Sequence, residues 1–334
     1  MTDAPILHLA APRGFCAGVE RAIEVVELAL RIHGAPIYVR HEIVHNRHVV
    51  EALRAEGAVF TDDLAAVPPG SVLVLSAHGV APAVRLEAEA RGLRVLDATC
   101  PLVTRVHLEA RRHAEEGRMV VLVGRRHHVE VQGTLGEAPE SIVVVETAAE
   151  AESLAAPDPG KVAYILQTTL SVDDSRAIVE VLRRRFPGLR EPARGICYAT
   201  QNRQNAVREL ARRCRTVFVV GSPNSSNARR LVEVAEGLGV DARLIEGPDD
   251  LGAGAIVAGA DVGVTASAST PEDVVQACVR RLQELGGFRV ESFLMAEETI
   301  TFPLPAELRA AARERGVEPR ADRPARPGGA GVPC

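Results

Sequence analysis

Lysine and tryptophan are almost missing from this 334-residue sequence. It has no tryptophan, aromatic residues make up only 3%, and its one lysine, Lys161, stands in a turn rich in proline and glycine. Few aromatic side chains and a net charge of −5 leave neither base-stacking platforms nor a basic surface for nucleic acid. A phosphate-loop lysine, or a Schiff-base lysine anywhere else in the chain, is also excluded.

Long apolar runs are missing as well. No segment approaches the roughly 20 apolar residues of a transmembrane helix. The first residues, Met1–Pro5, lack the basic start and apolar core of a signal peptide. We therefore expect no membrane attachment and a cytoplasmic location. In that reducing compartment the six cysteines indicate free thiols, metal binding or catalysis rather than disulfides.

Short aliphatic runs alternate with amphipathic helical patterns along the chain, which predicts an α/β fold with mostly parallel sheets. The predicted strands are Ile6–Ala10, Ile37–Val39, Val72–Leu75, Val120–Val123, Val143–Val145, Ala163–Leu166, Val217–Val220, Val262–Val264 and a late one at Thr299–Pro305. The predicted helices are Glu20–His33, Val49–Glu56, Val84–Ala90, Leu102–Glu116, Ser175–Phe186, Asn202–Cys214, Ala228–Leu238 and Glu272–Leu285.

Breaks near Ala98–Cys100 and Gly188–Gly195 divide the pattern into three comparable α/β units. The predicted divisions are 1–98 for the first unit, 99–193 for the second, 194–285 for the third, 286–316 for a segment that returns to the core, and 317–334 for the tail. That tail is rich in proline, glycine and arginine without periodicity, so we predict that it is disordered.

Three cysteines begin helical patterns in the three predicted units. They are Cys16, Cys100 and Cys197, separated by 84 and 97 residues. A helix N-terminus lowers the pKa of a thiol and favours the thiolate that metals bind. The Cys-x-x-Cys or His pairs of a zinc site are missing. Three soft thiolates without a fourth protein ligand suit an iron–sulfur cluster that keeps one iron open for substrate.

The alternative is that Cys16, Cys100 and Cys197 are buried cysteines with no shared role. For Cys214, Cys278 and Cys334 we prefer such a purely structural role, because they lack a comparable setting at the start of a helix.

Polar turns follow several predicted strands, and ligands of α/β sheets collect at such strand ends. One of them, Gly221–Asn227, precedes a helix and contains Ser225, Ser226 and Asn227. One N-cap needs one such residue, so the excess of donors indicates an anion site. His45 and His78 are further candidate donors, although a lone histidine is usually an ordinary surface or core residue. Ser269 by itself fits a plain helix cap.

Glu130 follows His128 in another of these turns. A carboxyl group close to an iron and an anion would have a raised pKa and would be a candidate proton donor. Taken alone, a loop carboxylate such as this is normally just solvated.

Over about residues 5–316 these motifs resemble the 4-hydroxy-3-methylbut-2-enyl diphosphate reductases, the IspH/LytB family. The segments that carry the resemblance are Pro12–Val19, Tyr38–Asn46, Ser76–Val80, Asp97–Val103, Gln167–Asp174, Ile196–Thr200, Asn202–Gln204 and Gly221–Asn227. Motifs of this length in this order are highly specific.

The resemblance implies three pseudo-repeated α/β domains around one central [4Fe–4S] cluster with one open iron. Its implied cluster ligands are Cys16, Cys100 and Cys197. Its implied substrate-binding residues are His45, His78, His128, Thr168, Ser225, Ser226, Asn227 and Ser269. The implied catalytic residues are Glu130, which delivers a proton, Thr168, which relays or holds that proton network, and His128.

The implied reaction is the reductive dehydroxylation of (E)-4-hydroxy-3-methylbut-2-enyl diphosphate to isopentenyl and dimethylallyl diphosphate. It uses two electrons and two protons and is the last step of the methylerythritol phosphate (non-mevalonate) isoprenoid pathway. The implied electron donor is ferredoxin or flavodoxin.

One loop departs from the family pattern. Arg125 replaces a usual histidine and Val129 a usual proline, while His128 and Glu130 keep their places. We therefore expect unchanged chemistry and an altered loop rigidity.

The alternatives to this function are an enzyme like quinolinate synthase, a cluster-bearing redox sensor, and a zinc-stabilised structural protein. A sensor has no need of many small polar donors beside a carboxyl, and iron and sulfide content would separate the zinc protein.

Overall fold

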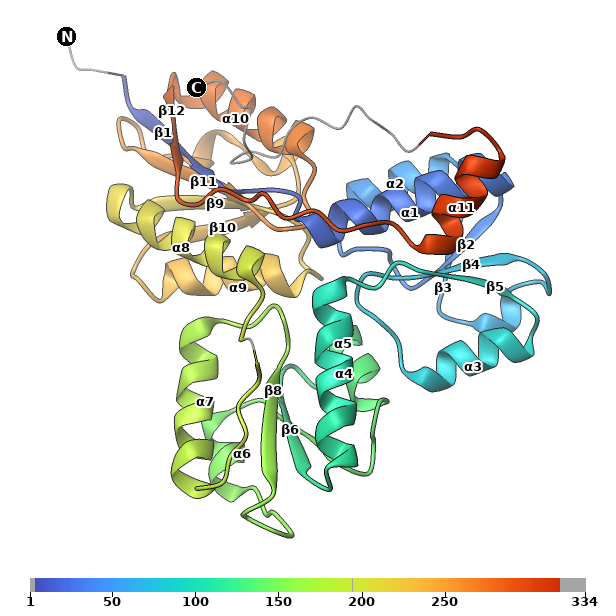
Figure 1. The fold of residues 1–334 in the computed structure, drawn as a ribbon. Helices are drawn as coiled ribbons and strands as arrows, with labels where there is room; N and C mark the ends of the chain where they lie inside the picture. Colours follow the sequence, from blue (N-terminus) through green and yellow to red (C-terminus); the bar gives the residue numbers. More distant parts are fainter. Residues whose placement is uncertain (1–3, 194, 319–334) are drawn as a thin grey trace.

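The computed structural model describes residues 4–193 and 195–318, and every strand pair in this part of the chain is parallel (Figure 1). Most central strands are largely apolar and buried on both faces, as in Val72–Leu75 and Thr216–Val220. Parallel sheets need that burial because their crossover helices cover both faces. The predicted α/β class with mostly parallel sheets is confirmed.

The strands form three separate sheets. The five-stranded sheet has the order β10 (Asp241–Ile245), β9 (Thr216–Val220), β11 (Val262–Ala266), β1 (Ile6–Ala11), β12 (Arg289–Leu294). The four-stranded sheet has the order β3 (Ala58–Thr61), β2 (Ile37–Arg40), β4 (Val72–Leu75), β5 (Arg94–Asp97). The three-stranded sheet has the order β7 (Ile142–Val145), β6 (Met119–Val123), β8 (Val162–Leu166). Figure 1 shows them as three lobes around a common centre.

Helices cover each sheet. On the four-stranded sheet lie α1 (Ala17–His33), α2 (Arg47–Ala55) and α3 (Pro82–Ala90). With the three-stranded sheet are α4 (Pro101–Glu115), α5 (Val129–Leu135), α6 (Ala148–Ser153) and α7 (Val172–Arg185). On the five-stranded sheet lie α8 (Tyr198–Arg213), α9 (Ser226–Glu236) and α10 (Glu272–Gly286), while α11 (Ala306–Glu314) packs on α1. None of the helices among residues 4–193 and 195–318 has the length and apolar character to cross a membrane.

All the predicted strands up to Val264 and all the predicted helices are present, but the late strand at Thr299–Pro305 is wrong. That stretch is extended without strand pairing. Pro303 and Pro305 carry no N–H to donate to a sheet, which explains the failure. The strand that does return to an earlier sheet is β12, Arg289–Leu294, which pairs with β1.

One strand pairs with a sheet outside its own predicted unit. β1, at the start of the predicted first unit, pairs with β11 and β12 and not with β2 to β5. The predicted unit boundaries stay predictions. Of the predicted tail only Val317 and Glu318 are described, so its predicted disorder lies outside the described residues.

Candidate functional site

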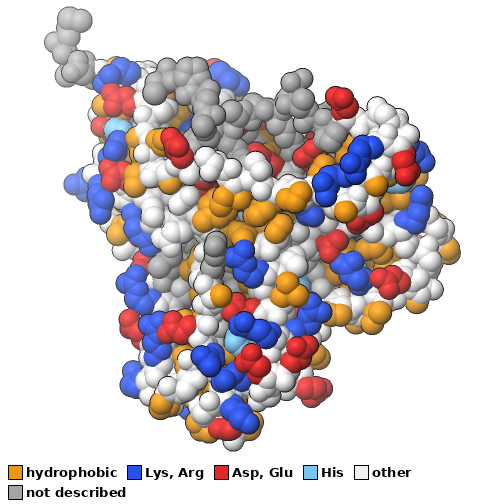
Figure 2. All heavy atoms as spheres, in the orientation of Figure 1, with side chains coloured by type: hydrophobic (Ala, Val, Ile, Leu, Met, Phe, Trp, Pro, Cys, Tyr) orange, Lys and Arg blue, Asp and Glu red, His pale blue; other side chains and the backbone are white. Residues whose placement is uncertain are grey.

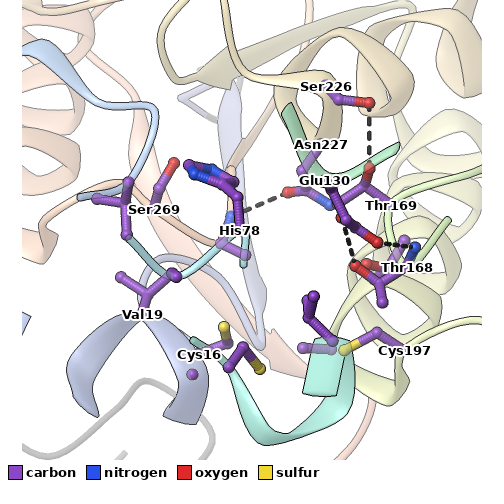
Figure 3. A pocket seen from close by; sticks show the side chains of 18 of the residues that line it. Cys16, Val19, His78, Glu130, Thr168, Thr169, Cys197, Ser226, Asn227 and Ser269 are labelled. Carbon is purple, nitrogen blue, oxygen red and sulfur yellow. Dashed lines mark hydrogen bonds between the residues drawn. The ribbon is translucent and has the colours of Figure 1, made fainter. Parts of the chain in front are cut away.

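The three predicted ligand cysteines occupy the same structural position in three helices. Cys16 is the N-cap residue of α1, Cys100 of α4 and Cys197 of α8, and none of their side chains makes a capping hydrogen bond. The thiols are therefore free to face outward from the three helix N-termini. All three line one cavity, and Figure 3 shows Cys16 and Cys197 at one end of it.

The space between the thiols suits a group larger than one ion. Within the described part of the chain, no three His, Cys, Asp or Glu side chains gather closely enough to hold a single metal ion. A Cβ built on Gly18 would lie 2.6 Å from the Sγ of Cys100 and 3.9 Å from that of Cys16. This glycine therefore keeps the room between two thiols open. Thiolates that bind different irons of a cluster stand further apart than ligands of one ion, so the donor set fits an iron–sulfur cluster.

The expectation that the helix N-termini lower the thiol pKa values is wrong for two of the cysteines. Burial and the neighbouring Cys16 raise the pKa of Cys100 to about 12 and that of Cys197 to about 11. The backbone N–H groups at the helix starts favour the thiolate and so lower the pKa, but the effect of burial is larger. Both thiols are therefore protonated at neutral pH until metal displaces the protons.

Three histidines that line this cavity contact one another. The rings of His45 and His78 stack with centroids 4.2 Å apart, and His128 meets both edge-on, at 5.6 and 6.0 Å. Burial lowers the pKa of His78 well below its usual value, and it lowers that of His128 to about 3. Both rings are therefore neutral at pH 7. The Nδ1 of His128 accepts from the backbone N–H of Glu130, which leaves the proton on Nε2 as a donor.

Glu130 is 3% exposed and lies between the cysteines and the polar end of the cavity in the view of Figure 3. The Thr168 backbone N–H donates to its Oε1 at 2.7 Å, and the Thr168 hydroxyl donates to its Oε2 at 3.0 Å. Burial raises the pKa of this carboxyl, while the two Thr168 hydrogen bonds oppose the rise. The group combines a raised affinity for a proton with a fixed orientation.

Small polar residues at the start of α9 form the other end of the cavity. The Oγ of Ser225 accepts from the N–H of Ala228 as the N-cap, and the Oγ of Ser226 accepts from the Thr169 hydroxyl. The Oδ1 of Asn227 accepts from the Ala268 N–H at 2.9 Å. Its Nδ2 is buried without a partner, so this amide is a ready donor to a ligand oxygen.

Ser269 lines the cavity, but its hydroxyl donates to the backbone oxygen of His45 at 2.9 Å. That bond joins the turn after β11 to the turn after β2. The Ser269 hydroxyl thus has a structural role in joining two turns, which the sequence did not indicate.

All of the residues predicted for the site line this one cavity. They are Cys16, His45, His78, Cys100, His128, Glu130, Thr168, Cys197, Ser225, Ser226, Asn227 and Ser269. Sequence reasoning missed Thr169 and Thr200, and it missed the apolar residues Val19, Leu102 and Val103. Thr169 was visible as the second hydroxyl of the turn after β8, whereas the apolar residues look like ordinary helix positions.

The loop that departs from the family pattern contacts α9. Arg125 forms an ion pair with Glu233 of α9 at 2.7 Å, and Val129 is the first residue of α5. The departures therefore leave His128 and Glu130 in the cavity.

Comparisons with known proteins agree with this geometry. The model of the LytB protein family matches residues 7–283. A 4-hydroxy-3-methylbut-2-enyl diphosphate reductase of Bordetella pertussis is 56% identical over 307 residues, which are 92% of this chain and 94% of that protein. The chain belongs to the LytB family. As a member it is an enzyme, an iron–sulfur oxidoreductase, which confirms the resemblance and excludes the quinolinate synthase, sensor and zinc-protein alternatives.

Further LytB-family proteins show how much of the chain is shared. A 4-hydroxy-3-methylbut-2-enyl diphosphate reductase of Azoarcus sp. is 55% identical over 91% of this chain and 97% of its own. The solved E-1-hydroxy-2-methyl-but-2-enyl-4-diphosphate reductase of Plasmodium falciparum has a TM-score of 0.91 and 40% identity, and it covers 94% of this chain and 99% of its own. A second solved reductase has a TM-score of 0.60 and 31% identity, over 84% of this chain and 99% of its own.

The histidine cluster predicts a loss of folding stability in acid. The pKa of His128 is about 3 in the folded protein and 6.5 in a free histidine side chain. Below about pH 6.5 the unfolded chain therefore binds more protons than the folded chain. Stability conferred by the neutral rings is full above that pH and falls as the pH falls from about 6.5 toward 3. We expect the Tm of the metal-free protein to fall less steeply between these values in His128→Asn.

The raised pKa of Glu130 acts in the opposite sense, so the test is the difference between variant and wild type. Parallel Tm profiles of the two proteins would contradict this origin of the acid sensitivity.

Proposed function

We propose that this chain reduces (E)-4-hydroxy-3-methylbut-2-enyl diphosphate to isopentenyl and dimethylallyl diphosphate, the last step of the methylerythritol phosphate (non-mevalonate) pathway. One observation carries the proposal. A single cavity has three helix-start thiols at one end, a cluster of neutral polar donors at the other, and a buried carboxyl between them. A reaction that needs electrons, an anion site and a proton at one substrate uses all three.

The proposed cofactor is one [4Fe–4S] cluster held by Cys16, Cys100 and Cys197, with one iron free of protein ligands. The open space beside Gly18 supports this assignment, since a Cβ at this position would lie only 2.6 Å from the Sγ of Cys100. When bound, the cluster would supply electrons one at a time and a Lewis-acidic iron for the substrate hydroxyl. The proposed external donor is a ferredoxin or flavodoxin. The cytoplasmic location stays a prediction.

The proposed diphosphate site is the polar end of the cavity. The unpartnered Nδ2 of Asn227 and the Nε2–H of His128 would donate to phosphate oxygens, helped by the N-terminus of α9. Ser225, Ser226, His45, His78 and Ser269 would complete this site. A pocket of neutral donors suits a chain with almost no lysine. It would also recognise the substrate without a buried permanent charge.

Glu130 is the proposed proton donor, with Thr168 holding its orientation. The reaction breaks the C–O bond of the allylic alcohol and adds two electrons and two protons. One proton leaves with the hydroxyl as water, and the other joins carbon at one of two positions of the five-carbon chain, which gives two products. Val19, Leu102 and Val103 would enclose that chain and exclude water.

The proposal is tested by anaerobic reconstitution with iron and sulfide, reduction by dithionite with a mediator, and addition of the substrate. Both isopentenyl and dimethylallyl diphosphate are expected among the products. Untouched substrate in the presence of an intact cluster would refute the proposed function.

Asn227→Asp should weaken diphosphate binding more than its small change in size suggests. The variant keeps an oxygen for the Ala268 N–H but turns the free donor into an anion that faces the phosphates. Loss of one hydrogen bond to a charged group corresponds to about 10- to 150-fold in affinity. We expect a Kd for pyrophosphate raised by at least about tenfold, measured by calorimetry.

The matched control is Asn205→Asp on α8, which adds the same charge outside the cavity and keeps an acceptor for Arg208. Equal pyrophosphate affinities of the two variants would remove Asn227 from the proposed diphosphate site.

A further inference from the structure

A buried ion pair lies behind the cysteines, in a part of the molecule that the proposed chemistry does not use. Arg203, on α8 six residues after Cys197, is 0% exposed. It is the largest fully buried side chain among the described residues. It pairs with Glu298, which is 4% exposed, at 3.0 Å. A buried arginine is rare unless all its donors are satisfied, so its partners indicate what it holds.

Every N–H group of Arg203 has an acceptor. Its Nε and Nη2 donate to the backbone oxygen of Gly14 at 3.2 and 2.7 Å, and Nη2 also reaches the oxygen of Phe15 at 3.4 Å. Its Nη1 donates to the oxygen of Ala199 at 2.9 Å. One guanidinium thus joins the turn before Cys16 to the first turn of the helix that Cys197 caps.

Glu298 comes from the segment between β12 and α11. It also accepts from the Nδ2 of Asn202 at 3.1 Å. All other residues from Arg289 to Pro303, each of them described, are exposed or half-buried, including Leu294 and Met295. Figure 2 shows hydrophobic side chains exposed across the middle of this face, where Figure 1 places the segment. The one buried side chain in this stretch is therefore the carboxylate that meets Arg203.

A second arginine makes a similar link to the remaining cysteine. Arg21, in the second turn of α1, donates to the backbone oxygens of Thr99 at 3.0 Å and Asp97 at 3.2 Å. It also donates to the oxygen of Pro303 at 2.8 Å. The backbone just before Cys100 is thereby joined to the helix of Cys16 and to the segment that carries Glu298.

Folding stability alone does not explain a buried ion pair, because well-packed apolar residues of the same volume often stabilise a protein as much or more. A guanidinium fixes the directions of several hydrogen bonds at once, which an apolar pair does not. The contacts of Arg203 are concentrated on the backbone that carries two of the three thiols. Precise spacing of those thiols is what a rigid cluster requires.

We propose that Arg203 and Glu298 are positioning residues that fix the spacing of the Cys16 and Cys197 thiols, with the segment between β12 and α11 as part of the cluster cradle. This inference rests on the proposed function, since it assigns the spacing to cluster retention. Without the pair the two thiols still exist, but the hydrogen bonds from Arg203 to Gly14 and Phe15 no longer join this turn to α8. The cluster should then dissociate faster from a folded protein.

The test replaces both charges together, Arg203→Met with Glu298→Leu, because a single replacement would leave an unpaired buried charge and could unfold the chain. The control is Leu282→Ala. This core residue of α10 is 0% exposed, and its removal costs stability without touching the cysteine loops. Two measurements are made on each protein. One is amide hydrogen exchange of the metal-free chain over residues 12–18 and 197–203, and the other is the rate of cluster bleaching by a chelator after anaerobic reconstitution.

We expect amide exchange in both peptides to be about tenfold faster in the double variant than in Leu282→Ala when the two proteins are compared at matched Tm. Cluster loss should be faster by about the same factor. Exchange or cluster loss equal to the control would overturn the proposal, since a general stability effect would then account for it. Wild-type protein that takes up no cluster would refute the proposed function, and the proposal with it. The exchange measurement, which needs no metal, tells that failure from a failure of the positioning pair.

Discussion

Glu130→Gln is expected to lower turnover by about 10²- to 10⁴-fold, the range that a positioned proton donor contributes. The amide is isosteric with the carboxyl, so the Thr168 N–H can still donate to its oxygen, and the Thr168 hydroxyl can turn to accept from its NH₂. The local fold and the cavity walls should survive. The variant lacks only the acidic proton of the carboxyl group. Because the cavity is otherwise unchanged, cluster content and pyrophosphate affinity should stay near wild type.

The measurement is single-turnover product formation with reduced protein, with iron content and pyrophosphate Kd recorded on the same sample. The matched control is Glu109→Gln. That carboxylate is also buried, at 8% exposed, and accepts from the Ala193 N–H, but it lies outside the cavity. Near-normal turnover of Glu130→Gln would rule out Glu130 as the required donor. A similar loss in both variants would point to a general effect of removing a buried carboxyl group.

The edges of the sheets explain which strands the sequence revealed. Every described central strand was predicted, and most of them, such as β4 and β9, are continuous buried runs. The four that were missed, β3, β5, β10 and β12, all lie at sheet edges and are partly exposed. β5, β10 and β12 mix polar and apolar residues, which gives neither a clean alternation nor an apolar run, and β3 has an apolar run of only three residues. The helices α5 and α6 were missed because they have only 7 and 6 residues, too few to show a helical period. The helix α11 was missed although it is as long as α2 and α3, which were predicted.

The site was more predictable than the fold around it. Strand-end turns must meet where parallel strands end, so residues far apart in sequence, such as Cys16 and Ser226, could be assigned to one cavity. The sequence could not reveal that β1 leaves its neighbours for the sheet of β9 to β12, because pairing partners are a tertiary choice. It also misjudged the thiol pKa values, since burial at Cys100 outweighs the helix start. The partners of Arg203 were invisible for the same reason: Gly14 and Glu298 are distant in sequence.

Cys100→Ser should cost the protein most of its cluster. A serine hydroxyl is a harder and much less acidic donor than a thiol, and iron–sulfur clusters are held by thiolates. The side chain at this position faces the space beside Gly18, and glycine offers no side chain that could replace the thiolate there. Changes even beyond the direct ligands commonly cost 10- to 100-fold in metal affinity. We expect at least about a 100-fold loss of turnover, with iron and sulfide per chain well below wild type after reconstitution.

The control for that variant is Cys214→Ser, because Cys214 is also buried and its thiol donates to the Leu210 oxygen, which a serine hydroxyl can do as well. It should keep full iron content and normal spectra. Since Cys214 lies at the end of α8 and Cys197 at its start, the comparison separates a thiol that binds metal from one that only packs. Full iron with unchanged spectra in Cys100→Ser would remove Cys100 from the ligand set. The two remaining thiols could not then hold a cluster in the proposed way, and the cofactor assignment would have to change before the role of Glu130 could be interpreted.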